Sequence, residues 1–102
     1  LNITHADIGT GTTPPANSDT ALEEAVARAA VSSQEVSANI VTLRFFFSDS
    51  VLPNGTYTEF GTFIDGSSGV GTGKLFNRIL FGDSYTKSSG EDSTFEVEIT
   101  IN

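Results

Sequence analysis

The sequence predicts a mainly β domain, an antiparallel β-sandwich with one short α-helix near the N-terminus. Two observations lead to this fold class. Segments rich in β-branched and aromatic residues alternate between apolar and polar positions, most cleanly at residues 94–101, and Gly-, Ser- and Asn-rich stretches separate them. Strands that follow one another through short turns pair antiparallel. With 102 residues, the chain is expected to form a single domain, 1–102.

The N-terminal third contains the predicted helix. Residues 3–8 read as a short strand, which the Gly- and Pro-rich residues 9–17 end. Thr20 and, three residues later, Glu23 make a capping-box pattern. Small apolar residues then recur at helical spacing as far as Ala29. We therefore expect a helix that lies close against a sheet.

The rest of the chain reads as strands and turns. An Asn-Gly pair is a strong tight-turn signal, and it lies between the apolar segments 40–48 and 56–64. These two segments are therefore expected to pair with each other. The predicted strands are 31–38, 40–47, 56–64, 74–81 and 94–101, with loops at 65–73 and 82–92.

The segment 57–64 is the strongest candidate for the centre of the fold. It has apolar residues at both odd and even positions, which point to opposite faces of a strand, and this indicates a strand buried on both faces. Gly61 marks a place where another group packs against the backbone. Glu59 needs a partner, because a buried carboxylate without one is costly. We expect one of three arginines to pair with it: Arg28, Arg44 or Arg78.

Aromatic residues are the candidates for an interface. Within a strand, Phe46 points away from the side on which its two Phe neighbours lie. Either the sheet is covered on both sides, by the helix and by a second sheet, or Phe46 is exposed at a subunit contact. Tyr57 and Tyr85 are further interface candidates. Together with loop carboxylates, they are the residues that a carbohydrate- or receptor-binding surface would use.

Composition and charge argue against several classes of partner. The net charge is −8, with five Lys and Arg against thirteen Asp and Glu. Binding to nucleic acid needs a basic face, so no nucleic-acid partner is expected. No apolar run approaches the ~20 residues of a membrane-spanning helix, so no membrane partner is expected. The chain has no Cys and a single His, so we expect no disulfide, no structural zinc and no cofactor. The acidic composition leaves an adventitious Ca²⁺ ion open.

Catalysis is not expected. The segment 69–74 resembles a phosphate loop, but Ser68 replaces its first Gly and Leu75 its final hydroxyl residue, so a hairpin loop is favoured. His5 has no second His or Cys with which to build a nucleophile or a metal site. A small hydrolase that uses Glu59 beside a second carboxylate is the weakest hypothesis, because solvated carboxylates on a sheet are the more common case.

Turn, cap and strand motifs lie in segments 8–15, 19–24, 26–28, 59–63 and 73–78. Their order resembles that in tail-fibre and tail-collar-type modules of tailed-bacteriophage virion proteins. In those proteins a first strand ends in a Gly-rich turn, and a helix with a Thr-Ala-Leu start and an Arg near its end follows. A Glu-apolar-Gly-apolar-Phe strand and a Gly-x-Leu-x-x-Arg strand come later, matched here by 59–63 and 73–78. Thr62 stands where the family usually has an apolar residue.

The resemblance implies a non-enzymatic virion structural protein. Such a protein would be a tail appendage, a fibre attachment module or a capsid-decoration protein, located in the virion. It would act as a homo-oligomer that docks on other virion proteins. The alternative is a carbohydrate- or receptor-binding β-sandwich module. The residues expected to hold the fold together are Arg28, Glu59, Gly61, Phe63 and Arg78.

Overall fold

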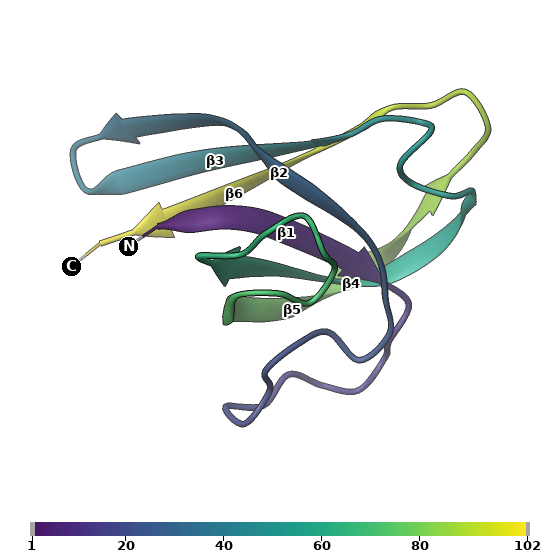
Figure 1. The fold of residues 1–102 in the computed structure, drawn as a ribbon, viewed down its shortest axis with the longest axis horizontal. Helices are drawn as coiled ribbons and strands as arrows, with labels where there is room; N and C mark the ends of the chain where they lie inside the picture. Colours follow the sequence, from purple (N-terminus) through teal and green to yellow (C-terminus); the bar gives the residue numbers. More distant parts are fainter. Residues whose placement is uncertain (1, 102) are drawn as a thin grey trace.

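The computed structural model describes residues 2–101, which form six strands (Figure 1). All pairings are antiparallel, and the strands make one nearly closed, barrel-like sheet in the order β5-β4-β1-β2-β3-β6. The described residues contain no helix, and hence none that could cross a membrane. The strands are β1 (Ile3–Gly9), β2 (Ala25–Ser37), β3 (Ile40–Phe47), β4 (Gly55–Ile64), β5 (Lys74–Lys87) and β6 (Ser93–Thr100).

The predicted sandwich is wrong, because β1 pairs with β2 on one side and with β4 on the other and so joins all the strands into one curled sheet. The two end strands, β5 and β6, meet through side chains rather than through a backbone ladder. The ring of Phe81 stacks on Phe95 with centroids 5.9 Å apart, and the hydroxyls of Tyr85 and Ser93 are 2.5 Å apart. These contacts close the barrel only part of the way along β6.

The interior of the barrel is aromatic. Phe45 and Phe47 are fully buried, whereas Phe46 between them is 47% exposed, as the alternation of a strand requires. The Phe60 ring lies 6.1 Å from Phe45 and 5.2 Å from Phe95, measured between centroids. Aromatic pairs at these distances contribute about 0.5–1.5 kcal/mol each beyond the area they bury. The cluster ties β3 and β6 to the opposite wall.

The predicted N-terminal helix is wrong. Thr20 to Glu24 adopt no regular structure, and the following residues form β2. The small apolar residues fit a strand equally well, because Ala27 and Ala29 lie two apart, are buried, and pair across the ladder with Ile8 and Ala6. The predicted strand 31–38 is confirmed as the second half of β2.

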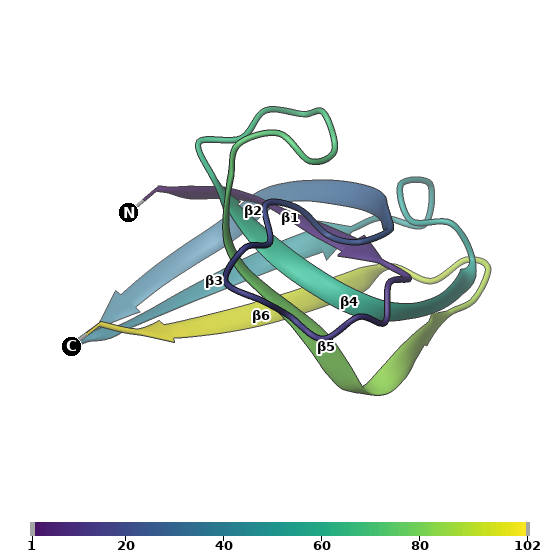
Figure 2. The same ribbon diagram turned by 90° about the horizontal axis from the view of Figure 1, so that it is seen from below.

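The prediction that strands 40–48 and 56–64 pair with each other is also wrong. Both strands exist, as β3 and β4, but β3 pairs with β2 and β6, while β4 pairs with β1 and β5. The connection between them crosses the end of the barrel instead of making a tight hairpin (Figure 2). The predicted strand 74–81 continues to Lys87, so only the second half of the expected loop 82–92 is a loop. The strands predicted at 3–8 and 94–101 are confirmed to within a residue.

Candidate functional site

The outward side of the sheet carries a row of side chains that are buried although they point away from the barrel interior. The register places Arg28 of β2 opposite Asp7 of β1, Asp7 opposite Gly61 of β4, and Gly61 opposite Arg78 of β5. Two long segments, 10–24 and 65–73, fold over this row. We call the set the covered face: Asp7, Arg28, Glu59, Gly61, Phe63 and Arg78.

Glu59 is at the centre of the covered face and has no exposed surface. One carboxylate oxygen accepts the Arg78 Nε–H at 2.8 Å and the backbone N–H of Glu23 at 3.0 Å. The other accepts the backbone N–H groups of Gly11 at 2.7 Å and Glu24 at 2.8 Å. The prediction that an arginine pairs with Glu59 is confirmed, and the arginine is Arg78. Glu59 thus satisfies amides of segment 10–24, which has no regular structure of its own to do so.

The pKa of Glu59 lies below its ordinary value. Burial is the largest influence and raises the pKa, but hydrogen bonds from the Glu24 amide, Arg78 and the amides of Glu23 and Gly11 together outweigh it. The group is therefore ionised at neutral pH, and its two oxygens accept four hydrogen bonds. A general base needs a free lone pair within reach of its substrate. This arrangement suits a structural role.

A second buried ion pair anchors the other covering segment. The Arg28 Nε lies 2.5 Å from the Asp7 carboxylate, and both side chains are almost fully buried. Asp7 also accepts the backbone N–H of Gly71 at 3.0 Å, and Arg28 donates to the Thr72 hydroxyl at 2.7 Å. The Arg28 guanidinium lies 4.6 Å from the centroid of the Phe63 ring, a cation–π contact. Segment 65–73 is therefore held by the same kind of charged group as segment 10–24.

Gly61 lies where the covering segment touches the sheet. A Cβ atom at this position would lie 2.6 Å from the Cδ1 of Leu22 and 2.9 Å from the backbone oxygen of Asn77. Atoms do not approach so closely, so only Gly allows Leu22 to seat on β4. The prediction that a group packs against the backbone here is confirmed. The group is a leucine from a loop, not one from a helix.

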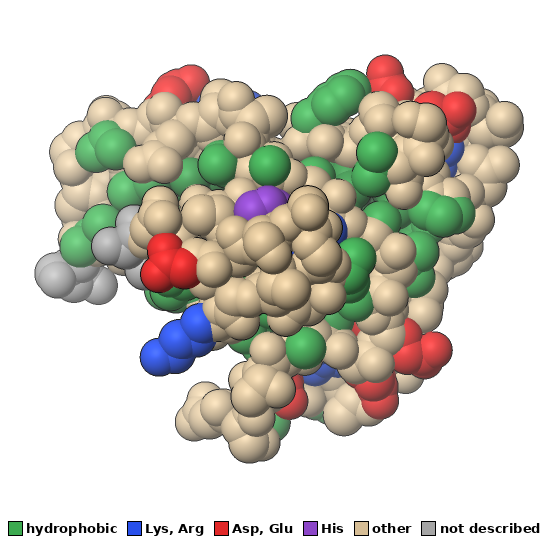
Figure 3. Space-filling model, viewed as in Figure 1, with side chains coloured by type: hydrophobic (Ala, Val, Ile, Leu, Met, Phe, Trp, Pro, Cys, Tyr) green, Lys and Arg blue, Asp and Glu red, His purple; other side chains and the backbone are tan. Residues whose placement is uncertain are grey.

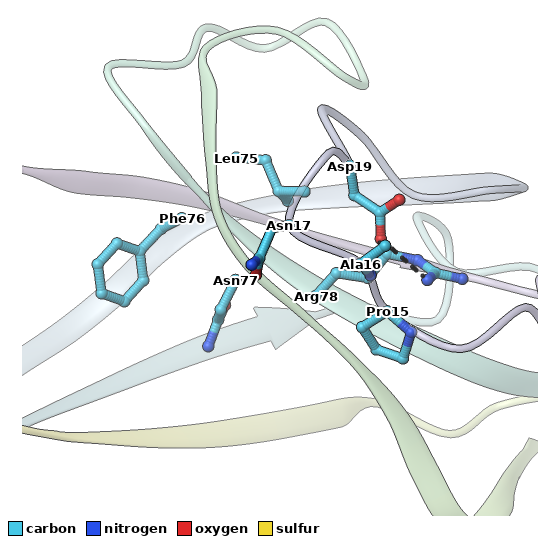
Figure 4. Close-up of a pocket in the computed structure, with 8 residues that line it drawn as sticks. All are labelled: Pro15, Ala16, Asn17, Asp19, Leu75, Phe76, Asn77 and Arg78. Atoms are coloured by element: carbon cyan, nitrogen blue, oxygen red, sulfur yellow. Dashed lines mark hydrogen bonds and ion pairs between the residues drawn. The ribbon is translucent and has the colours of Figure 1, made fainter.

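A cleft of about 310 Å³ opens beside the covered face, between segment 10–24 and β5 (Figure 4). On one side, the Arg78 Nη1 reaches Asp19 at 3.3 Å, while the Phe76 ring projects away from them. The Nη2 of Arg78 is buried and has no hydrogen-bond partner within residues 2–101. The lining residues are Pro15, Ala16, Asn17, Asp19, Leu75, Phe76, Asn77 and Arg78.

The three interface candidates differ in exposure. Phe46 is 47% exposed, so its side of the sheet is not covered by a helix or a second sheet within residues 2–101. A subunit contact at this ring stays a prediction. Tyr57 is buried, and its hydroxyl donates to the backbone oxygen of Pro53. The ring is therefore not exposed, contrary to the expectation from the sequence. Tyr85 is half-buried in the contact between β5 and β6. The two tyrosine rings therefore do not form the binding platform that the sequence suggested.

Two buried charged residues were missed by the sequence analysis. Asp7 interrupts the apolar strand 3–8 just as Glu59 interrupts its strand, so the same argument would have found it. Lys87 gave no signal, because it falls in a segment expected to be a loop. Its ammonium group is buried, pairs with the Asp49 carboxylate and donates to the Asn54 side chain at 3.1 Å. It ties together the loops at one end of the barrel.

His5 lies at the rim of the covered face, with its Nδ1 2.9 Å from the Thr4 hydroxyl. Burial is the main reason that its pKa is lowered, and the Arg28 charge adds to this, although Asp7 opposes it. The ring is neutral at pH 7. Within residues 2–101, no three His, Asp or Glu side chains are grouped to hold a metal ion.

The far ends of β2, β3 and β6 present a different surface, which we call the open corner: residues 33–37, 40–44 and 96–101. Hydrophobic side chains are exposed at this end of the molecule among side chains of other kinds (Figure 3). Val36 is 66% exposed and Ile101 51%. A groove of about 200 Å³ lies between the inward side of these strands and the start of β1. Its lining residues are Ile3, Gln34, Val41, Leu43, Ile99 and Ile101.

Comparison of the sequence with protein-family models and with curated proteins finds no match.

Proposed function

We propose that this chain is a non-enzymatic structural module of a tailed-phage virion, which works by self-association and by docking on other virion proteins. The resemblance rests on the order of the turn and strand motifs at 8–15, 59–63 and 73–78, whereas residues 19–28 do not form the helix that the family has between them. One structural observation supports a structural role for those motifs. Their charged residues, Arg28, Glu59 and Arg78, are buried in ion pairs and hydrogen bonds that fix the two covering segments.

Docking is the activity that the surface favours. The open corner exposes apolar side chains, and β5 and β6 each have one edge without a hydrogen-bonded neighbour within residues 2–101. Exposed apolar patches and free strand edges are surfaces that proteins use to bind other proteins. A stable contact would bury about 1,200–2,000 Å² in total. The buried charges contribute by keeping the surface in one shape.

The proposal is tested by measuring assembly directly. Multi-angle light scattering of the purified chain should give a mass larger than one copy, or a single copy that binds purified virion components in a pull-down. Images of particles that carry the tagged chain should show it in repeated copies at a fixed position. A chain that stays monomeric and binds no virion component would show the proposal to be wrong.

Carbohydrate or receptor binding is the second candidate, now at the cleft beside Arg78. The cleft places the Asp19 carboxylate and the Asn17 side-chain amide beside the apolar side chains of Pro15 and Leu75. Polar groups of this kind beside apolar side chains are typical of sites for small polar ligands. A glycan array decides this candidate: signal that an Asp19→Ala variant loses supports it, and an array without signal excludes it for the glycans present.

A further inference from the structure

The free edge of β6 is unusually regular. Its ladder with β3 runs from Ile40–Thr100 to Phe47–Ser93 without a shift in register. Each of the other four ladders in the described residues contains a shift or bulge. Proteins protect free edges with bulges, prolines or short strands. The edge of β5 is interrupted in this way, since residues 81–84 fall outside its pairing with β4. The β6 edge has no bulge, proline or break, and its charged side chains are two glutamates, Glu96 and Glu98.

The inward side of β6 is apolar and incompletely covered. Val97 and Ile99 face inward and are partly buried, and Ile101 beyond them is 51% exposed. The contact with β5 is made by Phe95 and Ser93, at the other end of the strand. From Glu96 onward the edge therefore lies beside the apolar groove of the open corner. A strand added here would place every second side chain over that groove.

The outward side of the same strands is acidic. Glu96 and Glu98 lie on it, together with Glu35 of β2. Arg44 already pairs with Glu35 at 2.8 Å and with Glu96 at 3.1 Å. Glu98 has no ion-pair partner within residues 2–101. A strand beside β6 thus meets uncompensated negative charge on its outward side, in a chain of net charge −8.

We propose that the free edge of β6 from Glu96 to Thr100, continued by Ile101, accepts an extended segment of a partner protein as a seventh strand. The segment alternates apolar residues, which cover the groove, with Lys or Arg residues, which face the glutamates. Backbone hydrogen bonds give such pairing its affinity, and the alternating side chains give its specificity. This inference rests on the proposed docking function and specifies the chemistry of the partner.

A second copy of the chain fits the edge poorly. Pairing two β6 edges would bring the glutamates of both strands onto one face, and like charges opposite each other destabilise a sheet. The charge of −8 on each copy adds to the repulsion where two β6 edges would meet. A basic partner segment meets neither penalty.

The test uses the whole chain and a fluorescently labelled peptide that alternates Val and Lys over the length of the β6 edge. Fluorescence anisotropy at low salt should show saturable binding. A scrambled peptide of equal composition, which retains the charge but not the alternation, should bind about tenfold more weakly. Alternate backbone nitrogens of the peptide face β6 or face away from it. Methylating the set that faces β6 should abolish binding, while methylating the other set should not. Hydrogen exchange at residues 96–101 should slow when the peptide binds.

Matched variants separate the edge from general charge attraction. Glu98→Lys should weaken peptide binding about threefold to tenfold, because it places like charges opposite each other. Glu24→Lys makes the same change of charge at an exposed side chain of segment 10–24, and it should change affinity far less. Thermal melts of both variants check that folding is intact. The methylated peptides test the proposal on the unaltered chain if a variant does not fold.

Equal binding of the alternating and scrambled peptides, or of the two methylated peptides, would overturn the proposal. A homodimer that the peptide displaces would overturn the proposed occupant. If no peptide binds but the chain still attaches to virion components, the edge proposal fails and the docking function stands. If the peptide binds by the edge but no virion component does, the virion function fails instead.

Discussion

The covered face and the open corner each contain an arginine held by two carboxylates, yet the two arrangements differ in what surrounds them. At the covered face, the side chains of Arg78 and Glu59 are 3% and 0% exposed. At the open corner, the side chains of Arg44 and Glu35 are 34% and 68% exposed. The covered charges lie beneath two folded segments, whereas the others lie in solvent.

From this difference we infer that burial decides how much an ion pair contributes to the free energy of unfolding of this protein. Removing one partner of a buried pair leaves an uncompensated charge and costs about 3–5 kcal/mol. Exposed pairs contribute about 0–1 kcal/mol. One end of the molecule is therefore fixed by its charges, while the charges of the other end remain available to a partner.

The largest expected effect comes from Glu59→Gln, which keeps the shape of the side chain but removes its charge. We expect the free energy of unfolding to fall by about 3 kcal/mol or more, because Arg78 loses its buried counter-charge. The matched change Glu35→Gln at the open corner should cost less than about 0.5 kcal/mol. Urea denaturation of both variants measures the two values.

A double variant sharpens this comparison. Arg78→Met removes the buried cation, so in the Glu59→Gln background it should cost clearly less than in the original chain. Additive losses in the double variant would contradict the coupling. Equal losses for Glu59→Gln and Glu35→Gln would contradict the distinction between the two regions.

The next effect in size is steric. Gly61→Ala places a methyl group against Leu22 and should lower the free energy of unfolding by about 1–3 kcal/mol. Gly82→Ala is the control, because no atom lies within 4 Å of the Cβ position there. Thermal melts compare the two. Tolerance of Ala at position 61 would mean that Leu22 does not seat tightly on β4.

The smallest effect is a dependence on pH. The folded-state pKa of Glu59 is below its unfolded value of ~4.3, so its ionisation stabilises the fold above that pH. This stabilisation is lost as the pH falls through the folded-state pKa. Urea denaturation between about pH 5 and 3 should therefore show a steeper loss of stability in the original chain than in Glu59→Gln. Parallel profiles would place the acid-sensitive group elsewhere.

Local sequence determined more of the central strand than of the chain around it. Residues 57–64 have apolar side chains at both odd and even positions. Both faces of this strand are therefore expected to be buried, whichever elements cover them. The need of Glu59 for a cation follows from the cost of burying a charge. The need for a Gly at position 61 follows from the same double burial. These predictions were correct because they depend on one segment and on general physical chemistry.

Only the tertiary structure decided which groups meet. The Ala-rich residues 25–31 fit a helical period and a strand period alike. They form a strand because their backbone groups pair with those of β1. Arg78 rather than Arg28 reached Glu59, because the register of β5 places it beside β4, whereas Arg28 lies opposite Asp7. Pairing between strands distant in sequence also made a barrel rather than a sandwich. No local pattern specifies such contacts, because their free energy depends on residues far along the chain.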